Sequence, residues 1–244
     1  NFISEIEQAA RRINPHILKT PLFLSNYLSN MNTGKVYLKL ESEQYTGSFK
    51  IRGALNKILK LSAAGNRKAL CTASTGNHAQ GFARALSVSG LQGIIYLPVN
   101  ADPSKIEALK NYDVTLQFYG DDCLQTEIYA KKKAEEKGMI WVSPYNDTDI
   151  IAGQGTIGLE ICESLDNIDY VLGTIGGGGM MSGVSSWFKY RSPKTQVIGC
   201  LPQNSPEMYL SVKQGRIVHL EEAMETLSDG SAGGLEENSI TYDI

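Results

Sequence analysis

The sequence contains no cluster of cysteine or histidine. Its cysteines stand far apart, no CxxC pair occurs, and only three histidines are present. A structural zinc site needs such ligands at short spacing, so none is expected. No secretory signal is apparent, and the sequence therefore predicts reduced thiols in a cytoplasmic protein. The cysteines are Cys71, Cys123, Cys162 and Cys200.

An excess of one charge and a long apolar run are also missing. The formal net charge is −3 and the pI is about 5.7, which offers no electrostatic reason to expect nucleic acid or an anionic membrane as a partner. No stretch of about 18 apolar residues occurs, so no transmembrane helix is predicted. Residues 1–13 have the pattern of an amphipathic helix rather than of a signal peptide. Together these features predict a soluble, cytoplasmic globular protein.

What the sequence does contain is a regular alternation of strand and helix patterns. Such alternation predicts an α/β fold with parallel, helix-flanked sheets. In these sheets, ligands bind where the carboxyl ends of strands lead into helix N-termini. The expected strands are 35–42, 68–74, 93–98, 114–120, 139–145, 169–175 and 195–202. The expected helices are 1–13, 49–61, 79–88, 103–112, 123–138, 149–165 and 180–191.

One strand-to-helix loop holds four consecutive glycines, Gly176, Gly177, Gly178 and Gly179. Backbone N–H groups can converge there without side-chain obstruction, beside the positive end of a helix dipole. The pattern predicts a phosphate site, with a glycine-rich packing turn as the alternative. The loop matches neither GxGxxG nor the P-loop pattern, so it does not by itself identify the phosphate compound.

A second strand-to-helix loop contains Ser74, Thr75, Gly76, Asn77 and His78. Small hydroxyl groups, an amide and backbone donors at a helix N-terminus suit a carboxylate, and a well-capped helix is the alternative. The histidine can equally be a packed or capping residue. Because no GxSxG pattern occurs, a serine-hydrolase triad is not indicated.

A third candidate is Lys50, which follows Thr46, Gly47 and Ser48 and lies in the first turn of an expected helix. The positive helix end and burial both disfavour a protonated amine, and a lysine with a lowered pKa can form a Schiff base with an aldehyde. An exposed surface lysine is the alternative. Taken together, an amine, a phosphate loop and a carboxylate loop indicate pyridoxal 5′-phosphate acting on an amino acid.

Four motifs then suggest a family. "SFKIRGA", "STGNHAQG", "PYND…IAGQGTIGLEI" and "GGGGMMSG" occur in this order within residues 41–183, and "LSDGSAGG" follows at 227–234. The sequence thereby resembles the serine/threonine dehydratases and serine racemases, which are fold-type II pyridoxal-phosphate enzymes, and is closest to threonine dehydratase. The resemblance implies a lyase that converts L-threonine, L-serine or both to a 2-keto acid and ammonia by β-elimination. It also implies a homodimer.

The same resemblance implies roles for individual residues. Lys50 would carry the cofactor as a Schiff base and then act as the base for the Cα proton. Phe49 would pack on the pyridine ring, and Asn77 would bond the phenolic oxygen. Gly176–Gly179 would hold the phosphate, and Gly230 would lie near the cofactor.

The loop from Ser74 to His78 would hold the substrate carboxylate in this family. Thr75 occupies the position where serine racemases carry serine and many dehydratases carry alanine. Its hydroxyl group could serve as a second acid or base, so a serine or related amino-acid racemase stays open as an alternative. A non-catalytic paralogue that binds the cofactor or an amino acid is the third possibility.

The resemblance also implies two lobes and reveals two departures. A large cofactor-binding lobe would take residues 1–71 plus 150–244, and 72–149 would form a small mobile lobe. The family continues beyond residue 244 with a segment that carries the partner of the pyridine nitrogen, so the sequence is expected to be incomplete. Leu201 stands where some racemase-like members have an acidic metal ligand, and Glu207 alone makes a weak site, so no metal is predicted.

Overall fold

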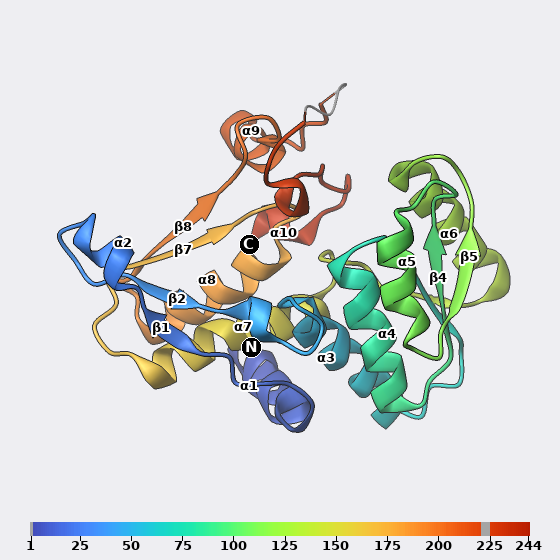
Figure 1. Cartoon of the computed structure of the whole chain (residues 1–244), viewed down its shortest axis with the longest axis horizontal. Helices are drawn as coiled ribbons and strands as arrows, with labels where there is room; N and C mark the ends of the chain where they lie inside the picture. The colour runs from blue at the N-terminus through green and yellow to red at the C-terminus, as the bar shows by residue number, and fades with distance from the viewer. Residues whose placement is uncertain (1, 221–224) are drawn as a thin grey trace.

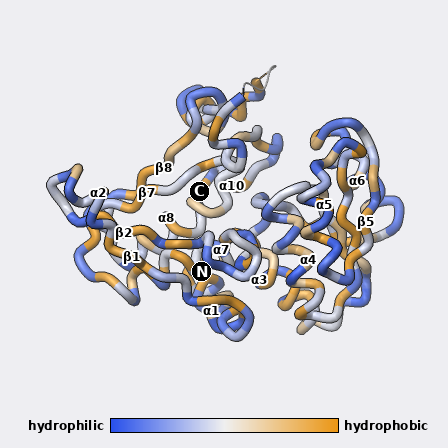
Figure 2. The backbone as a smooth tube through the Cα atoms, in the orientation of Figure 1, coloured by the Kyte–Doolittle hydropathy of each residue, from blue (hydrophilic) through white to orange (hydrophobic). Residues whose placement is uncertain are grey.

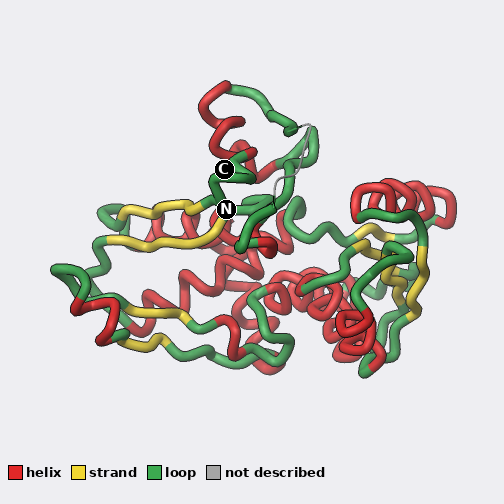
Figure 3. The backbone as a smooth tube through the Cα atoms, turned by 45° about the horizontal axis from the view of Figure 1, so that its top comes forward, coloured by secondary structure: helices red, strands yellow, loops and turns green. Residues whose placement is uncertain are grey.

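The protein is built from two adjoining α/β parts in the computed structural model, which describes residues 2–220 and 225–244 (Figure 1). One part contains a four-stranded sheet, and the other contains two short two-stranded sheets with helices between them (Figure 3). This arrangement confirms the predicted α/β fold with parallel, helix-flanked sheets. No described helix is both long and apolar enough to cross a membrane.

The four-stranded sheet lies within residues 70–141. Its strands and helices are β3 (Leu70–Ala73), α4 (Asn77–Ser89), β4 (Gly93–Leu97), α5 (Pro103–Lys110), β5 (Thr115–Phe118), α6 (Cys123–Lys137) and β6 (Ile140–Trp141). The strand order is β5-β4-β3-β6, and all pairs are parallel. Successive strand residues face opposite sides of a sheet. Leu70 and Ile95 therefore join the hydrophobic cluster beneath α4 and α5, whereas Cys71 and Tyr96 pack with residues of α6.

The second part surrounds a layer of helices. Its longer helices are α1 (Phe2–Ile13), α3 (Lys50–Ala63), α7 (Thr148–Ser164) and α8 (Gly179–Arg191). Its strands are β1 (Leu22–Leu24), β2 (Tyr37–Lys39), β7 (Tyr170–Thr174) and β8 (Gln196–Cys200). The short helices are α2 (Asn26–Asn30), α9 (Glu207–Gln214) and α10 (Ile240–Asp243), with 3-10 turns at Asn14–His16, Glu41–Glu43 and Asp229–Ser231. β7 and β8 pair in parallel, and β1 and β2 pair antiparallel.

Helix α7 is the centre of this packing, since α1, α3 and α8 all contact it. Glycines allow the close approaches. A Cβ atom on Gly183 would lie 2.3 Å from the carbonyl oxygen of Ile151, and one on Gly153 would lie 2.6 Å from that of Arg52. Helix α1 is less buried than α7, and hydrophobic and hydrophilic residues alternate along it in Figure 2. Its Ile6 is fully buried.

All predicted helices and strands occur, with ends that differ by a few residues; residue 1 of the first predicted helix lies outside the described residues. The unpredicted elements β1, α2, α9 and α10 are short, so each offers too few residues for a clear period. The predicted strand 35–42 is reduced to Tyr37–Lys39, and it pairs antiparallel with β1 instead of joining a parallel sheet. The lobe boundaries, 1–71 plus 150–244 and 72–149, and the mobility of the smaller lobe stay predictions.

Candidate active site

Lys50 is the first residue of helix α3, as the sequence predicts to within one position. The preceding turn closes where the N–H of Gly47 donates to the carbonyl of Gln44 over 2.7 Å, and Gly47 has the positive φ of 68° that favours glycine. The Nζ of Lys50 donates to the carbonyl oxygen of Pro144 over 2.9 Å. Although the residue is partly exposed, the atoms packed around its amine exclude water, and this desolvation lowers the pKa of Lys50 to about 8.

The loop that contains Ser74 reaches Lys50 through the packing of α4 on α3. A Cβ atom on Gly81 would lie 3.0 Å from both the backbone nitrogen of Ile51 and the carbonyl carbon of Lys50, so a larger residue would push the two helices apart. Within the loop, the N–H of Gly76 donates to the Ser74 hydroxyl over 3.2 Å. Asn77 begins the helix and is exposed.

His78 is buried at the start of the same helix. Its Nε2 lies 3.3 Å from the carbonyl oxygen of Val142, which suits a neutral ring that donates from Nε2. Burial, and then the nearby charge of Lys50, lower the pKa of His78 to about 3. The ring is therefore neutral at physiological pH, and its hydrogen bond connects the start of α4 to Val142, the residue that follows strand β6. Thr75 is partly buried in this loop.

The glycine loop links β7 to α8, with Gly178 in the left-handed region at φ 85° just before the helix. The ring of Tyr145 covers this loop. A Cβ atom on Gly177 would lie 2.5 Å from that ring, and one on Gly179 would lie 3.0 Å from the Tyr145 backbone. Because Tyr145 directly follows Pro144, the Lys50 amine and the glycine loop meet at the same short stretch of chain.

Two further predicted residues lie at the margins of this arrangement. The Phe49 ring centroid is 5.5 Å from the Nζ of Lys50, and the ring packs against a cluster that includes Phe188. Gly230 lies in an exposed 3-10 turn with open space around its Cα atom. That turn adjoins the glycine loop, since a Cβ atom on Gly176 would lie 3.0 Å from the carbonyl oxygen of Ser231.

Sequence reasoning assigned no role to Pro144 or Tyr145. Both belong to the "PYND" motif, which served only to indicate a family. A signal was present, because Pro144 and Tyr145 lie at the carboxyl end of the predicted strand 139–145, where ligand sites form. A local pattern could not show, however, that the Pro144 carbonyl accepts a hydrogen bond from a lysine 94 positions away.

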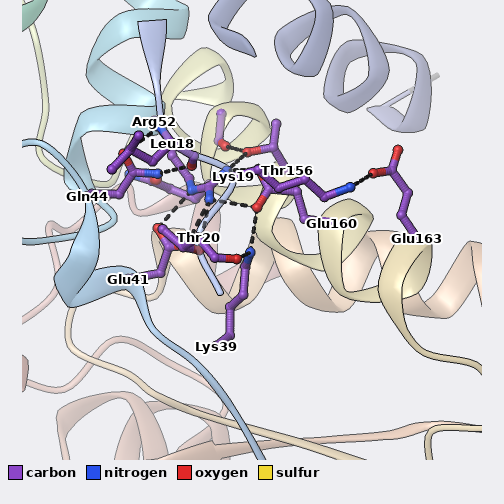
Figure 4. A network of polar contacts seen from close by, with 12 residues as sticks. Leu18, Lys19, Thr20, Lys39, Glu41, Gln44, Arg52, Thr156, Glu160 and Glu163 are labelled. Atoms are coloured by element: carbon purple, nitrogen blue, oxygen red, sulfur yellow. Dashed lines mark hydrogen bonds and ion pairs between the residues drawn. The ribbon is translucent and has the colours of Figure 1, made fainter. Parts of the chain in front are cut away.

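A buried ionic cluster lies behind the first turn of α3; it consists of Lys39, Glu41, Arg52 and Glu160 (Figure 4). The Arg52 side chain is 0% exposed and donates to Glu41 from Nε over 2.8 Å and to Glu160 from Nη1 over 2.6 Å. Burial opposes the charged form, but both carboxylates outweigh it and raise the pKa of Arg52. The cluster joins α3, β2 and α7, so it fixes the helix turn that carries Lys50.

The residues present fit a phosphate-bearing aldehyde. The glycine loop has no side chains to obstruct its backbone N–H groups, and it opens a helix whose first N–H groups suit an anion. Lys50 supplies an amine that desolvation makes easier to deprotonate. Among the described residues, no three histidine, cysteine, aspartate or glutamate side chains gather as a metal site would require.

Comparison with known proteins identifies the family. The profile of the family described as "Pyridoxal-phosphate dependent enzyme" matches residues 13–244. The chain belongs to this family. The resemblance drawn from the sequence motifs is thereby confirmed, and pyridoxal phosphate is the cofactor that defines the family.

Two named relatives show which members of the family the chain is similar to. The chain is 40% identical to the L-threonine ammonia-lyase of Thermotoga maritima over 230 residues, which cover 94% of this chain and 57% of that protein. It is 39% identical to the catabolic L-threonine dehydratase TdcB of Escherichia coli K12 over 242 residues, or 99% of this chain and 73% of that protein.

Two solved structures of the family have nearly the same fold. The processed threonine deaminase isoform 2 of Solanum lycopersicum superposes with a TM-score of 0.93 at 33% identity, covering 99% of this chain and 66% of that one. Maize serine racemase gives 0.92 at 32% identity, covering 98% and 73%. The chain thus spans about three fifths to three quarters of the length of these relatives.

Proposed function

We propose that the protein is a pyridoxal-phosphate-dependent ammonia-lyase that converts L-threonine, L-serine or both to a 2-keto acid and ammonia. The observation that carries the proposal is the Lys50 amine. It has a pKa of about 8 and is hydrogen-bonded to the Pro144 carbonyl, close to two loops that open helices. The names of the relatives at about 40% identity support the same reaction.

In this proposal, the cofactor supplies an electron sink next to the substrate's Cα atom. The backbone N–H groups of Gly176–Gly179 hold its phosphate at the positive end of α8. The N–H groups and hydroxyls of the loop from Ser74 to His78 hold the substrate carboxylate at the start of α4. Both anions are then fixed relative to α3, because the helices that bind them pack on α7 or α3.

Lys50 takes the Cα proton in the elimination. With a pKa of about 8, roughly a tenth of the free amine is neutral at pH 7, compared with a negligible fraction for an ordinary lysine. The Pro144 carbonyl holds the amine in one orientation. His78 stays neutral near the amine, so it does not compete as a second charge at physiological pH.

A racemase is the second candidate, because the hydroxyl of Thr75 could return a proton from the other side and a serine racemase shares the fold at 32% identity. The test is incubation of the cofactor-loaded protein with L-threonine and L-serine. Keto acid should form faster than D-serine, and the Thr75→Ala variant should still release keto acid. Faster accumulation of D-serine that disappears in Thr75→Ala would replace the lyase by the racemase.

The reaction of Lys50 with the cofactor distinguishes the proposed enzyme from a non-catalytic binding protein. The protein with pyridoxal phosphate should develop a visible absorbance band, and borohydride should fix the cofactor to Lys50. Lys50→Ala should lose the band, and its rate of keto-acid release should fall by about 10²–10⁴. Lys132→Ala, which removes an exposed lysine of α6, should behave as the parent protein. A parent protein without band or adduct would refute the proposal.

The proposal retains three further predictions. They are a cytoplasmic location, a homodimer, and a small hydroxy-amino acid as the binding partner in place of nucleic acid or membrane. Chromatographic mass determination with light scattering would test the homodimer.

A further inference from the structure

Glu236 connects the C-terminal segment to the loop that faces Lys50. Its backbone N–H donates to the Tyr145 hydroxyl over 2.7 Å. Its carboxylate accepts from the hydroxyl of Ser143 over 3.3 Å and from the amide of Asn146 over 3.2 Å. Lys131 of helix α6 lies 3.2 Å from the same carboxylate. One residue therefore contacts both ends and the middle of the 143–146 loop.

The contact continues on the C-terminal side of Glu236. The Asn146 side chain accepts from the N–H of Ile240 over 2.9 Å and donates to the carbonyl of Asn238 over 3.3 Å. Further along, the Thr241 hydroxyl donates to the carbonyl of Gly177 over 2.7 Å. The segment 236–241 therefore lies along the 143–146 loop and reaches the glycine loop.

The 143–146 loop in turn determines where the Pro144 carbonyl points. That carbonyl accepts the hydrogen bond of the Lys50 amine, and the adjacent Tyr145 ring covers Gly177. We propose that Glu236 is a positioning residue for Lys50, because it holds the 143–146 loop against the amine and keeps water away from it. The inference rests on the proposed role of Lys50 as the reactive amine.

The physical consequence of losing Glu236 follows from desolvation. Ser143 and Asn146 would each lose their carboxylate partner, whereas Tyr145 would keep its backbone donor, and the loosened loop would admit water beside the Lys50 amine. Water stabilises the charged amine, so the pKa of Lys50 should rise toward its ordinary value. The charge of Lys50 acts on the nearby His78, whose pKa is about 3, so His78 is neutral throughout the pH range in which Lys50 titrates.

The experiment measures the pH dependence of Lys50 acetylation by acetic anhydride, followed by mass spectrometry, in the protein without cofactor. The parent midpoint is expected near 8. Glu236→Ala should raise it by about half a unit or more, and Glu236→Gln, which keeps an acceptor oxygen, should raise it less. Glu237→Ala is the matched control, since Glu237 is the exposed neighbour and should leave the midpoint unchanged.

Tyr145→Phe provides a second test that removes a single oxygen and keeps the ring over the glycine loop. It should shift the midpoint in the same direction even if Glu236→Ala folds poorly. An unchanged midpoint in folded Glu236→Gln and Tyr145→Phe would overturn the inference, and so would an equal shift in Glu237→Ala. Because labelling needs neither cofactor nor turnover, these outcomes are distinct from a failure of the proposed lyase activity.

Discussion

Two groups of contacts fix the surroundings of Lys50, and they differ in their exposure to solvent. One is the ionic cluster of Lys39, Glu41, Arg52 and Glu160, and the other is the contact between Glu236 and the 143–146 loop. The ionic cluster is almost inaccessible to solvent, with the Arg52 side chain 0% exposed and the Glu160 side chain 9% exposed. The contact between Glu236 and the 143–146 loop is more accessible to solvent, since the side chains of Glu236 and Lys131 are 25% and 34% exposed. Charges removed from water cannot easily exchange partners, whereas half-exposed hydrogen bonds can be replaced by water. The contacts that fix the start of α3 are therefore better shielded from water than those that fix the 143–146 loop.

Breaking the ionic cluster should have the largest effect on stability. Arg52→Met removes the cation from between Glu41 and Glu160 and leaves two carboxylates, of which Lys39 still pairs with Glu160. We expect the free energy of unfolding, measured by urea denaturation, to fall by about 3–5 kcal/mol.

The matched control for the cluster is an exposed ion pair that Glu163 of the same helix α7 forms with Lys19. Lys19 and Glu163 are 56% and 52% exposed, so Lys19→Met should cost about 1 kcal/mol or less. Equal losses in Lys19→Met and Arg52→Met would contradict the distinction between the dry cluster and the surface.

The Lys50 amine itself gives the next largest effect, and its sign depends on pH. The pKa of Lys50 is about 8 in the folded protein and near 10.5 when unfolded, so the unfolded chain binds more protons between these values. Stability should therefore rise as the pH increases from 8 to 10.5, by up to about 3 kcal/mol. Lys50→Met should lose this dependence and be more stable than the parent below pH 8. Parallel stability–pH curves for the two proteins would argue against a desolvated amine.

A substitution in the glycine loop should reduce stability less than Arg52→Met does, but it should weaken cofactor binding more. Gly177→Ala places a Cβ atom 2.5 Å from the Tyr145 ring, which must move. We expect a loss of about 1–3 kcal/mol together with weaker binding of pyridoxal phosphate in an absorbance titration. Gly34→Ala, with open space around the new Cβ atom, is the control. If Arg52→Met weakened cofactor binding as much as Gly177→Ala, the ionic cluster and the glycine loop would not have different effects on the site.

The elements were predictable where the pattern is long. The helix that begins at Lys50 and the strand that precedes Gly176 are both recognisable from period and flanking glycines. Strand β1 was missed because three residues after Pro21 show no alternation. The cofactor family followed from motifs and is confirmed, whereas the individual roles of Thr75, Asn77 and Gly230 stay predictions.

By itself, the sequence determined the α/β order, the glycine loop and the position of Lys50 at a helix start, because each depends on residues close together in the chain. Only the tertiary structure decided which groups surround Lys50. The hydrogen bond from Lys50 to the Pro144 carbonyl and the ion pair of Arg52 with Glu160 each connect segments about a hundred residues apart. The burial that lowers the pKa of Lys50 likewise depends on the packing of distant segments. Such pairs arise from the packing of whole helices, which no local period records.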